Sequence, residues 1–184
     1  MTRDRVLIDA CVLYPTVMRE MVLGVAAQGL FEPLWSARLL EEWARAAAKQ
    51  GPTAEAQARG EIAVVKATWP QALRPAAPGV EARLWLPDAG DLHVLAVVID
   101  ASADVLLTLN AKDFPRGTLA EEGLRRADPD GYLLEHWQNA PEAVEAVAAQ
   151  VLAQARTLSG EAWEMRALLK KARLPRLGKA LGAV

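Results

Sequence analysis

Residues 5–15 read RVLIDACVLYP, in which a short apolar run at residues 6–8 ends at Asp9. A run that is apolar at every position is typical of a strand buried on both faces. A second run of this kind, DVLLTL, covers residues 104–109. Segments with the apolar spacing of amphipathic helices lie between and after the two runs. This alternation predicts the α/β class, as a three-layer α/β/α sandwich with a central parallel sheet.

The spacing of apolar residues predicts helices at residues 17–29, 37–50, 55–69, 92–102, 141–158 and 161–172. Ser36 is expected to cap the helix that starts at residue 37, because serine is a preferred N-cap residue. Short strands are predicted at residues 31–35 and 83–86, a loop at 70–79 and a turn cluster at 128–131. We therefore predict a first domain, residues 1–134, and a C-terminal helical extension, residues 135–184.

Composition limits the classes of protein that this chain can join. A net charge of -2 argues against wide coating of nucleic acid, for which proteins are usually basic. The apolar runs are too short to cross a bilayer, so no membrane partner is expected. Cys11 is the only cysteine, which excludes an internal disulfide and a cysteine-rich zinc site. A lone thiol is consistent with a reducing cytoplasm, and we predict a cytoplasmic location.

Charge is unevenly placed near the C-terminus. No acidic residue follows Glu164, whereas six basic ones do: Arg166, Lys170, Lys171, Arg173, Arg176 and Lys179. This segment is either a solvated helical face or a surface for phosphates or for an acidic partner.

Acidic side chains stand where strands end and helices begin. Asp9 ends the first strand, Asn110 and Asp113 follow the second, Asp91 opens a helix, and Glu42 lies early in another. Each alone is readily explained as a turn, cap or solvated residue. In a parallel sheet, however, the carboxyl ends of strands and the starts of the following helices share one edge. We therefore expect these side chains to converge.

Converging carboxylates need something that offsets their repulsion. Two of them at ~4 Å repel by about 4 kcal/mol at an effective dielectric of 20. An oxygen-only set, without cysteine or a histidine pair, suits Mg²⁺ or Mn²⁺ better than zinc. Such a site supports hydrolytic phosphoryl transfer. The candidate catalytic and metal-binding residues are Asp9, Glu42, Asp91 and Asp113.

Other polar residues near these acids are candidates for holding substrate or for shaping the site. Arg38 and Lys112 lie close in sequence to the acids and are candidates for gripping phosphates. Thr108 is expected to hold a carboxylate through its hydroxyl, and Asn110 is a further candidate for substrate binding. His93 lies two residues after Asp91 and is therefore expected to point elsewhere and to pack or lie on the surface.

Four blocks, in this order, resemble the PIN-domain nucleases, and among them the VapC-like toxins of bacterial type II toxin–antitoxin systems. The blocks are RVLIDACVLYP at 5–15, LWSARLLEEW at 34–43, LPDAGDLHVLAVVIDASADVLLTLN at 86–110 and TLNAKDFP at 108–115. The resemblance aligns Asp9, Glu42 rather than Glu41, and Asp91 with the acidic positions of the family. The segment LLKKARLPRLGKAL at 168–181 also resembles the tail of a branch with a C-terminal helical extension.

This resemblance implies an RNA substrate, a divalent cation, an antitoxin protein as inhibitor, and homodimers. The chain departs from the family at Asn110, where many relatives carry Asp. Either Asp113 supplies the fourth carboxylate, or three suffice and Asn110 contributes a neutral oxygen. The same departure favours one alternative, a catalytically inactive relative that binds RNA or protein. A phosphatase-like domain is a weaker alternative, because Cys11 stands where it would carry a second Asp.

Overall fold

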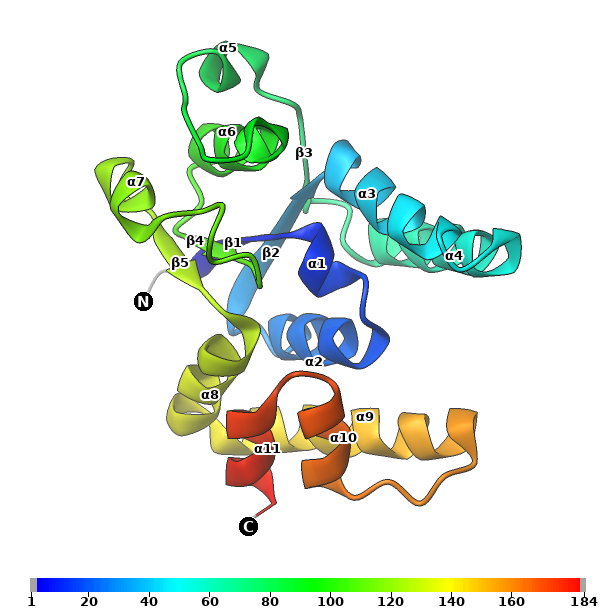
Figure 1. The fold of residues 1–184 in the computed structure, drawn as a ribbon. Coiled ribbons are helices and arrows are strands. Elements are labelled where there is room, and N and C mark those ends of the chain that lie inside the picture. Colours follow the sequence, from blue (N-terminus) through cyan, green and yellow to red (C-terminus); the bar gives the residue numbers. More distant parts are fainter. Residues whose placement is uncertain (1–2, 183–184) are drawn as a thin grey trace. The chain divides into compact units, whose positions relative to one another are not determined.

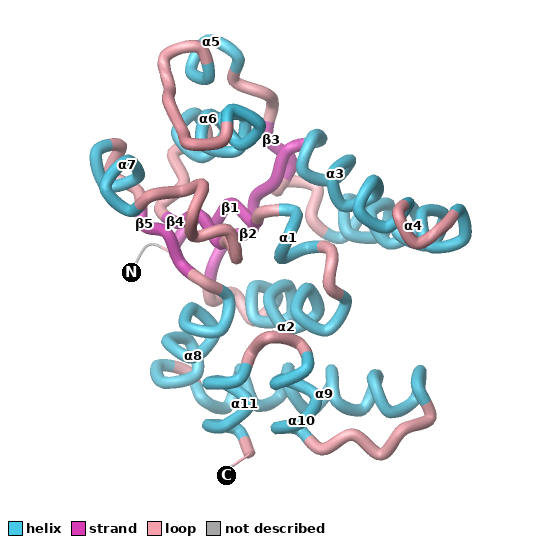
Figure 2. The backbone as a smooth tube through the Cα atoms, in the orientation of Figure 1, coloured by secondary structure: helices cyan, strands magenta, loops and turns pink. Residues whose placement is uncertain are grey.

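The computed structural model describes residues 3–182 (Figure 1). Residues 1, 2, 183 and 184, the outer ends of the two predicted domains, lie outside the described residues. Five short parallel strands form one sheet in the order β3-β2-β1-β4-β5 (Figure 2). They are β1 (Asp4–Ile8), β2 (Phe31–Ser36), β3 (Leu73–Arg74), β4 (Val105–Leu107) and β5 (Arg125–Ala127). The predicted parallel α/β fold is confirmed.

The two apolar runs of the sequence are neighbours in this sheet. β1 pairs with β4 in parallel, with Val6 opposite Val105 and Ile8 opposite Leu107. The side chains of residues 6–8 and 105–107 are at most 1% exposed, as expected of strands covered on both faces. The backbone N–H of Asp9 donates to the carbonyl of Leu107 at 3.0 Å. This bond holds the first acidic residue at the carboxyl edge of the sheet.

The chain divides into two compact units, and the first, residues 1–14 and 32–126, holds most of the sheet. Its helices are α1 (Ala10–Leu13), α3 (Ala37–Ala48), α4 (Pro52–Thr68), α5 (Pro78–Glu81), the 3₁₀ turn η1 (Ala89–Asp91), α6 (Leu92–Asp100) and α7 (Arg116–Glu121). The hydroxyl of Ser36 accepts from the N–H of Leu39 at 3.2 Å, so the predicted cap of α3 is confirmed.

The second unit, residues 15–31 and 127–184, is helical. It contains α2 (Thr16–Ala27), α8 (Pro129–Asn139), α9 (Pro141–Ser159), α10 (Met165–Lys171) and α11 (Pro175–Leu181). The buried carboxylate of Asp130 accepts from the backbone N–H groups of Arg176 and Leu177, each at 3.0 Å, and so caps α11 against α8. This unit also contains α2 and all of α8, so it does not coincide with the predicted extension at residues 135–184. The predicted domain boundary between residues 134 and 135 stays a prediction.

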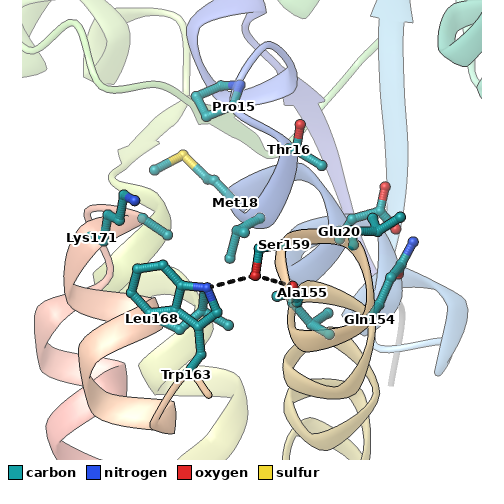
Figure 3. Close-up of a pocket in the computed structure, with 14 residues that line it drawn as sticks. Pro15, Thr16, Met18, Glu20, Gln154, Ala155, Ser159, Trp163, Leu168 and Lys171 are labelled. Atoms are coloured by element: carbon teal, nitrogen blue, oxygen red, sulfur yellow. Dashed lines mark hydrogen bonds between the residues drawn. The ribbon is translucent and has the colours of Figure 1, made fainter. Parts of the chain in front are cut away.

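A groove of about 440 Å³ lies in the second unit, between α2, α9 and α10 (Figure 3). Its walls are largely apolar and include Met18, Leu158 and Leu168. The indole N–H of Trp163 donates to the hydroxyl of Ser159 at 3.1 Å, which fixes the ring at the rim. No metal-compatible group of side chains found among residues 3–182 lies in this groove.

The structure corrects several predicted elements. Residues 83–86 form a turn and irregular backbone rather than a strand, and β3 lies inside the predicted loop 70–79. A strand of two residues carries no alternation that a sequence can reveal. The turn cluster at 128–131 opens α8, because Asp128 caps the helix through Gly131 N–H and Pro129 occupies its first turn. The remaining unpredicted elements are α1, α5, α7, β5 and α11.

Among residues 3–182, no helix has both the length and the apolar character that crossing a bilayer requires.

Candidate metal centre

Asp9 is a buried carboxylate held from one side. Its Oδ2 atom accepts hydrogen bonds from the hydroxyl of Thr108 at 2.6 Å and from the thiol of Cys11 at 3.2 Å. The Thr108 hydroxyl in turn accepts from the backbone N–H of Asn110 at 2.9 Å. Both bonds to Asp9 fall on Oδ2, and neither falls on Oδ1. The segment that follows β4 therefore orients the carboxylate at the end of β1 and leaves one oxygen for other partners.

Cys11 is a neutral bridge in this arrangement. Its sulfur accepts from the backbone N–H of Leu109 at 3.3 Å while the thiol donates to Asp9. Burial, with the nearby charge of Asp9, raises the pKa of this thiol to about 12. A thiol with so high a pKa is protonated at neutral pH, so Cys11 lacks the thiolate that a nucleophile requires.

Three carboxylates converge beside Asp9. Ligand oxygens of Asp88, Asp91 and Asp113 all lie within 4.8 Å of one another. Asp91 and Asp113 were predicted site residues, and Asp88 was not among the candidates. Asp88 also caps the 3₁₀ turn at residues 89–91, because its Oδ1 accepts from the N–H of Gly90 at 2.7 Å. Asp9 and Glu42 are not members of this close triplet.

Asn110 links two members of the triplet. Its side-chain nitrogen donates to Oδ2 of Asp113 at 2.6 Å and to Oδ2 of Asp91 at 3.3 Å. In the metal-free structure the NH₂ group therefore faces both acids. Asp113 belongs to the triplet and is placed to supply the fourth carboxylate. A neutral oxygen from Asn110 toward a bound cation stays a prediction.

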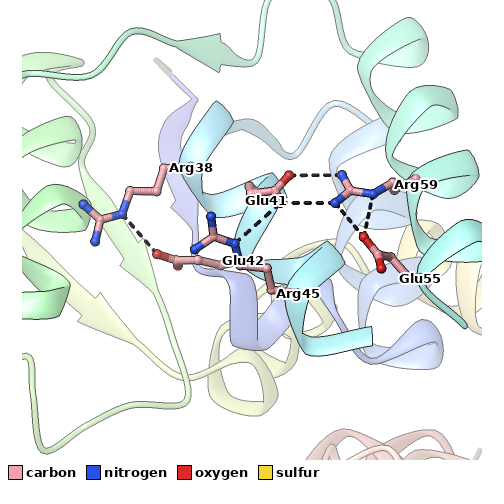
Figure 4. A network of polar contacts seen from close by, with 6 residues as sticks. All are labelled: Arg38, Glu41, Glu42, Arg45, Glu55 and Arg59. Carbon is pink, nitrogen blue, oxygen red and sulfur yellow. Dashed lines mark hydrogen bonds and ion pairs between the residues drawn. The ribbon is translucent and has the colours of Figure 1, made fainter. Parts of the chain in front are cut away.

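Glu42 is held by two basic side chains. Its Oε1 atom lies 2.9 Å from Nε2 of His93. The same atom lies 3.4 Å from Nε of Arg38 (Figure 4). Burial alone would raise the pKa of Glu42, but the hydrogen bond and charge of His93, together with Arg38, lower it below its ordinary value. Glu41 instead pairs with Arg59 at 3.0 Å and Arg45 at 3.5 Å. Glu42 is therefore the carboxylate turned toward the site.

The expectation that His93 points away from the site is wrong. Its side chain is buried and contacts Glu42. The expectation assumed helical spacing from Asp91, but Asp91 closes the 3₁₀ turn η1 and α6 begins only at Leu92. The angle between successive side chains differs across such a junction. The position of His93 in the first turn of α6, directly after Asp91, was the sequence feature that could have indicated a place near the site.

The two residues predicted to bind phosphates, Arg38 and Lys112, differ in their surroundings. Arg38 lies at the border of the site, where it contacts Glu42 and donates to the carbonyl of Gly90 at 3.3 Å. Lys112 is exposed, next to Asp113 in the loop after β4.

Electrostatics shows that five carboxylates share one field. The pKa of Asp91 is raised from its ordinary 3.8 to about 6, first by burial and then by the negative charges of Asp9, Asp88, Asp113 and Glu42. In the metal-free protein, a group with this pKa is partly protonated near neutral pH. A cation bound here would offset both the burial of Asp91 and the repulsion from its neighbouring carboxylates.

The donor set fits a hard divalent cation. Oxygens that bind one such ion at about 2.1 to 2.5 Å lie within about 5 Å of one another. The triplet of Asp88, Asp91 and Asp113 satisfies this limit at 4.8 Å. The thiol of Cys11 is protonated and bonded to Asp9, so no soft ligand competes.

An oxygen-only acidic cluster at the carboxyl edge of a parallel sheet defines a class of α/β proteins with a metal-compatible centre. A family model of the PIN domain matches residues 5–112, more than half of the chain. The chain belongs to the PIN domain family. PIN domains are typically metal-dependent nucleases, and the acidic cluster is compatible with this activity. The matched region contains Asp9, Glu42, Asp91 and Asn110. Searches among curated proteins and among solved structures found no match.

We predict a pH dependence of the metal-free protein that originates at Asp91. Its folded pKa, about 6, exceeds the ordinary value of 3.8, so the folded state binds the proton more tightly than the unfolded state. The contribution of Asp91 to the free energy of unfolding therefore grows as the pH falls from about 7 to about 4. The melting temperature in EDTA should rise on going from pH 7 to pH 5, and Asp91→Asn should reduce that rise. The difference is small because Asp91 is partly exposed. An identical pH profile for the variant would contradict the prediction.

We also predict that Asn110 stabilises the metal-free cluster. Asn110→Ala removes two hydrogen bonds to carboxylates, which should lower the free energy of unfolding by about 1 to 2 kcal/mol, or the melting temperature by roughly 2 to 8 °C. Asn110→Asp adds a negative charge and should lower it further in EDTA, whereas Mn²⁺ should then raise it more than in the unmodified protein. Gln71→Glu, an exposed position, is the matched charge control. A metal-free melting temperature of Asn110→Asp equal to that of the control would refute the role.

Proposed function

We propose that this protein is a divalent-metal-dependent endoribonuclease that hydrolyses phosphodiester bonds in RNA. The observation that carries the proposal is the gathering of Asp9, Asp88, Asp91 and Asp113 at one edge of a PIN-domain sheet. The proposed cofactor is Mg²⁺ or Mn²⁺, since these ions prefer oxygen ligands and support hydrolytic phosphoryl transfer.

In this proposal Asp88, Asp91 and Asp113 hold the cation, and Asp9 and Glu42 complete the acidic set. When bound, the cation would lower the pKa of an attacking water and offset the negative charge of the phosphate. Thr108 keeps Asp9 oriented, because its hydroxyl is fully engaged between that carboxylate and the N–H of Asn110. We assign positioning roles to Thr108 and Asn110, and contacts with substrate phosphates to Arg38 and Lys112.

A catalytically inactive RNA- or protein-binding module is the alternative that Asn110 favoured. We rank this alternative second because the site retains several carboxylates although position 110 is Asn. It donates to Asp91 and Asp113, and both remain available to a cation.

Metal-dependent cleavage of a fluorescent single-stranded RNA tests the proposal. Asp9→Asn and Asp91→Asn should each lower the rate in Mn²⁺ by at least about 100-fold, more than the loss typical of outer-shell partners of a metal. EDTA should abolish cleavage by the unmodified protein. Asp100→Asn, the same substitution at an exposed position on α6, is the matched control and should retain full activity. Cleavage that survives EDTA, or that persists in Asp91→Asn, would exclude this metal centre.

We further propose that the protein acts in the cytoplasm as the toxin of a toxin–antitoxin pair, with a cognate antitoxin as partner and possible homodimers. The VapC-like blocks at residues 5–15 and 86–110 support this role. Induced expression in a bacterial host should arrest growth, and Asp91→Asn should not. Co-expression of a small protein encoded beside the gene should restore growth. Unimpaired growth with active, RNA-cleaving protein present would rule out the toxin role but not the nuclease activity.

A further inference from the structure

A second cavity, of about 400 Å³, lies in the first unit, at the carboxyl ends of β2 and β3. Its polar lining comes from Ser36, Arg38, Arg74, Glu81 and His93. Arg38 and His93 both contact Glu42 of the acidic cluster, so they border the cavity and the cluster at once. The volume lies within the range of about 300 to 1,000 Å³ that is usual for small-ligand sites.

Arg74 is a cationic side chain in the wall of this cavity. Among the residues that the structure describes, its guanidinium forms no ion pair, and its Nε is buried without a hydrogen-bond partner. Native proteins rarely retain a buried donor that is left unpaired without a reason. By contrast, Arg38 is engaged by Glu42 and by the carbonyl of Gly90. Arg74 is therefore available for an anion that enters the cavity.

The first turn of α3 adds positive potential to the same cavity. Ser36, Ala37 and Arg38 line it, and they form the N-cap and the first two positions of this 12-residue helix. The first N–H groups of a helix lack partners within the helix, and the dipole places partial positive charge there. Glu81 is the one acidic residue in the lining. The charge of Arg38 is offset by Glu42 and that of Arg74 by no ion pair among the described residues, so Arg74 and the helix N-terminus together face Glu81 and favour an anion such as a phosphate.

His93 supplies a second kind of recognition. The ring is 5% exposed and lines the cavity, and among residues 3–182 its Nδ1 finds no hydrogen-bond partner. A buried polar atom in the wall of a cavity can hydrogen-bond a ligand that enters the cavity. A polar atom beside a phosphate-binding cation suits a group that combines an anion with further polar groups. A nucleotide is such a group.

We infer that this cavity binds one nucleotide of the substrate RNA, with its phosphate against Arg74 and the N-terminus of α3. The inference rests on the proposed ribonuclease function and assigns it a strand-binding subsite. Because His93 and Arg38 connect the cavity to Glu42, the bound nucleotide belongs to the strand whose phosphodiester lies at the acidic cluster. Arg74 here binds substrate without taking part in bond cleavage.

Binding of a fluorescein-labelled eight-nucleotide RNA to the full chain in EDTA tests the subsite, with anisotropy measured over a series of NaCl concentrations. Arg74→Ala should weaken binding at least about 10-fold and should reduce the slope of log affinity against log salt by about 0.7, as expected for the loss of one phosphate contact to a single strand. Arg45→Ala is the matched control, because Arg45 is an exposed arginine on α3 that does not line the cavity. It should leave both affinity and slope unchanged. If Arg74→Ala lowers the melting temperature, the same measurements are made on Arg74→Gln, which keeps a polar side chain.

In the Mn²⁺ cleavage assay, Arg74→Ala should raise KM about 10-fold with kcat unchanged, because it removes binding shared by ground state and transition state. An Arg74 variant with the affinity, salt slope and KM of Arg45→Ala overturns the subsite, even if cleavage is metal-dependent. Arg74-dependent RNA binding without any cleavage would instead support the subsite and reject the nuclease activity. A loss of kcat with unchanged KM would also overturn the subsite, because it would place Arg74 in the chemical step.

Discussion

Repulsion among carboxylates at the edge of the sheet is the constraint to which the surrounding structure responds. Burial first, and then the negative charges of Asp9, Asp88, Asp113 and Glu42, raise the pKa of Asp91. Each neighbour of the cluster reduces that strain in a different way. Thr108 and Cys11 donate to Asp9, the amide of Asn110 donates to two acids, and His93 with Arg38 offsets Glu42. These contacts permit a metal-free fold while leaving carboxylate oxygens available to a cation.

The scaffold that holds this cluster is rigid where the acids attach. β1 and β4 are buried on both faces, and the Asp9 N–H extends their hydrogen bonding by one step, so Asp9 has little freedom. The other acids come from segments that start helices or follow strands, where side chains near the carboxyl edge point beyond the sheet. Asp88 caps the 3₁₀ turn η1, Asp91 is its last residue, and Asp113 lies in the loop after β4. A parallel sheet thus turns residues distant in sequence into neighbours.

Much of the fold and part of the site could be predicted from sequence patterns, and each of these patterns has one physical cause. The apolar runs at 6–8 and 104–109 predicted the central strands because burial on both faces removes alternation, and Ser36 predicted the start of α3. The failures also have causes. β3 has two residues and no pattern, and the apolar stretch at 83–86 is too short to distinguish a strand from a turn. His93 was misplaced because a 3₁₀ turn interrupts the helical spacing, and Arg74 could not be recognised because it lies in a segment predicted to be a loop.

The overall charge of -2 argued against wide nucleic-acid binding, and the distribution of charge resolves that argument. Negative charge is concentrated where a cation fits, and Arg74, which forms no ion pair among residues 3–182, lines the second cavity. In the proposed complex, a phosphodiester strand would be repelled by the bare acids and attracted once a cation neutralises them, while Arg74 and the α3 N-terminus would attract it in either state. Such binding through a few placed groups would need no basic surface. The proposed RNA binding is therefore compatible with a near-neutral chain.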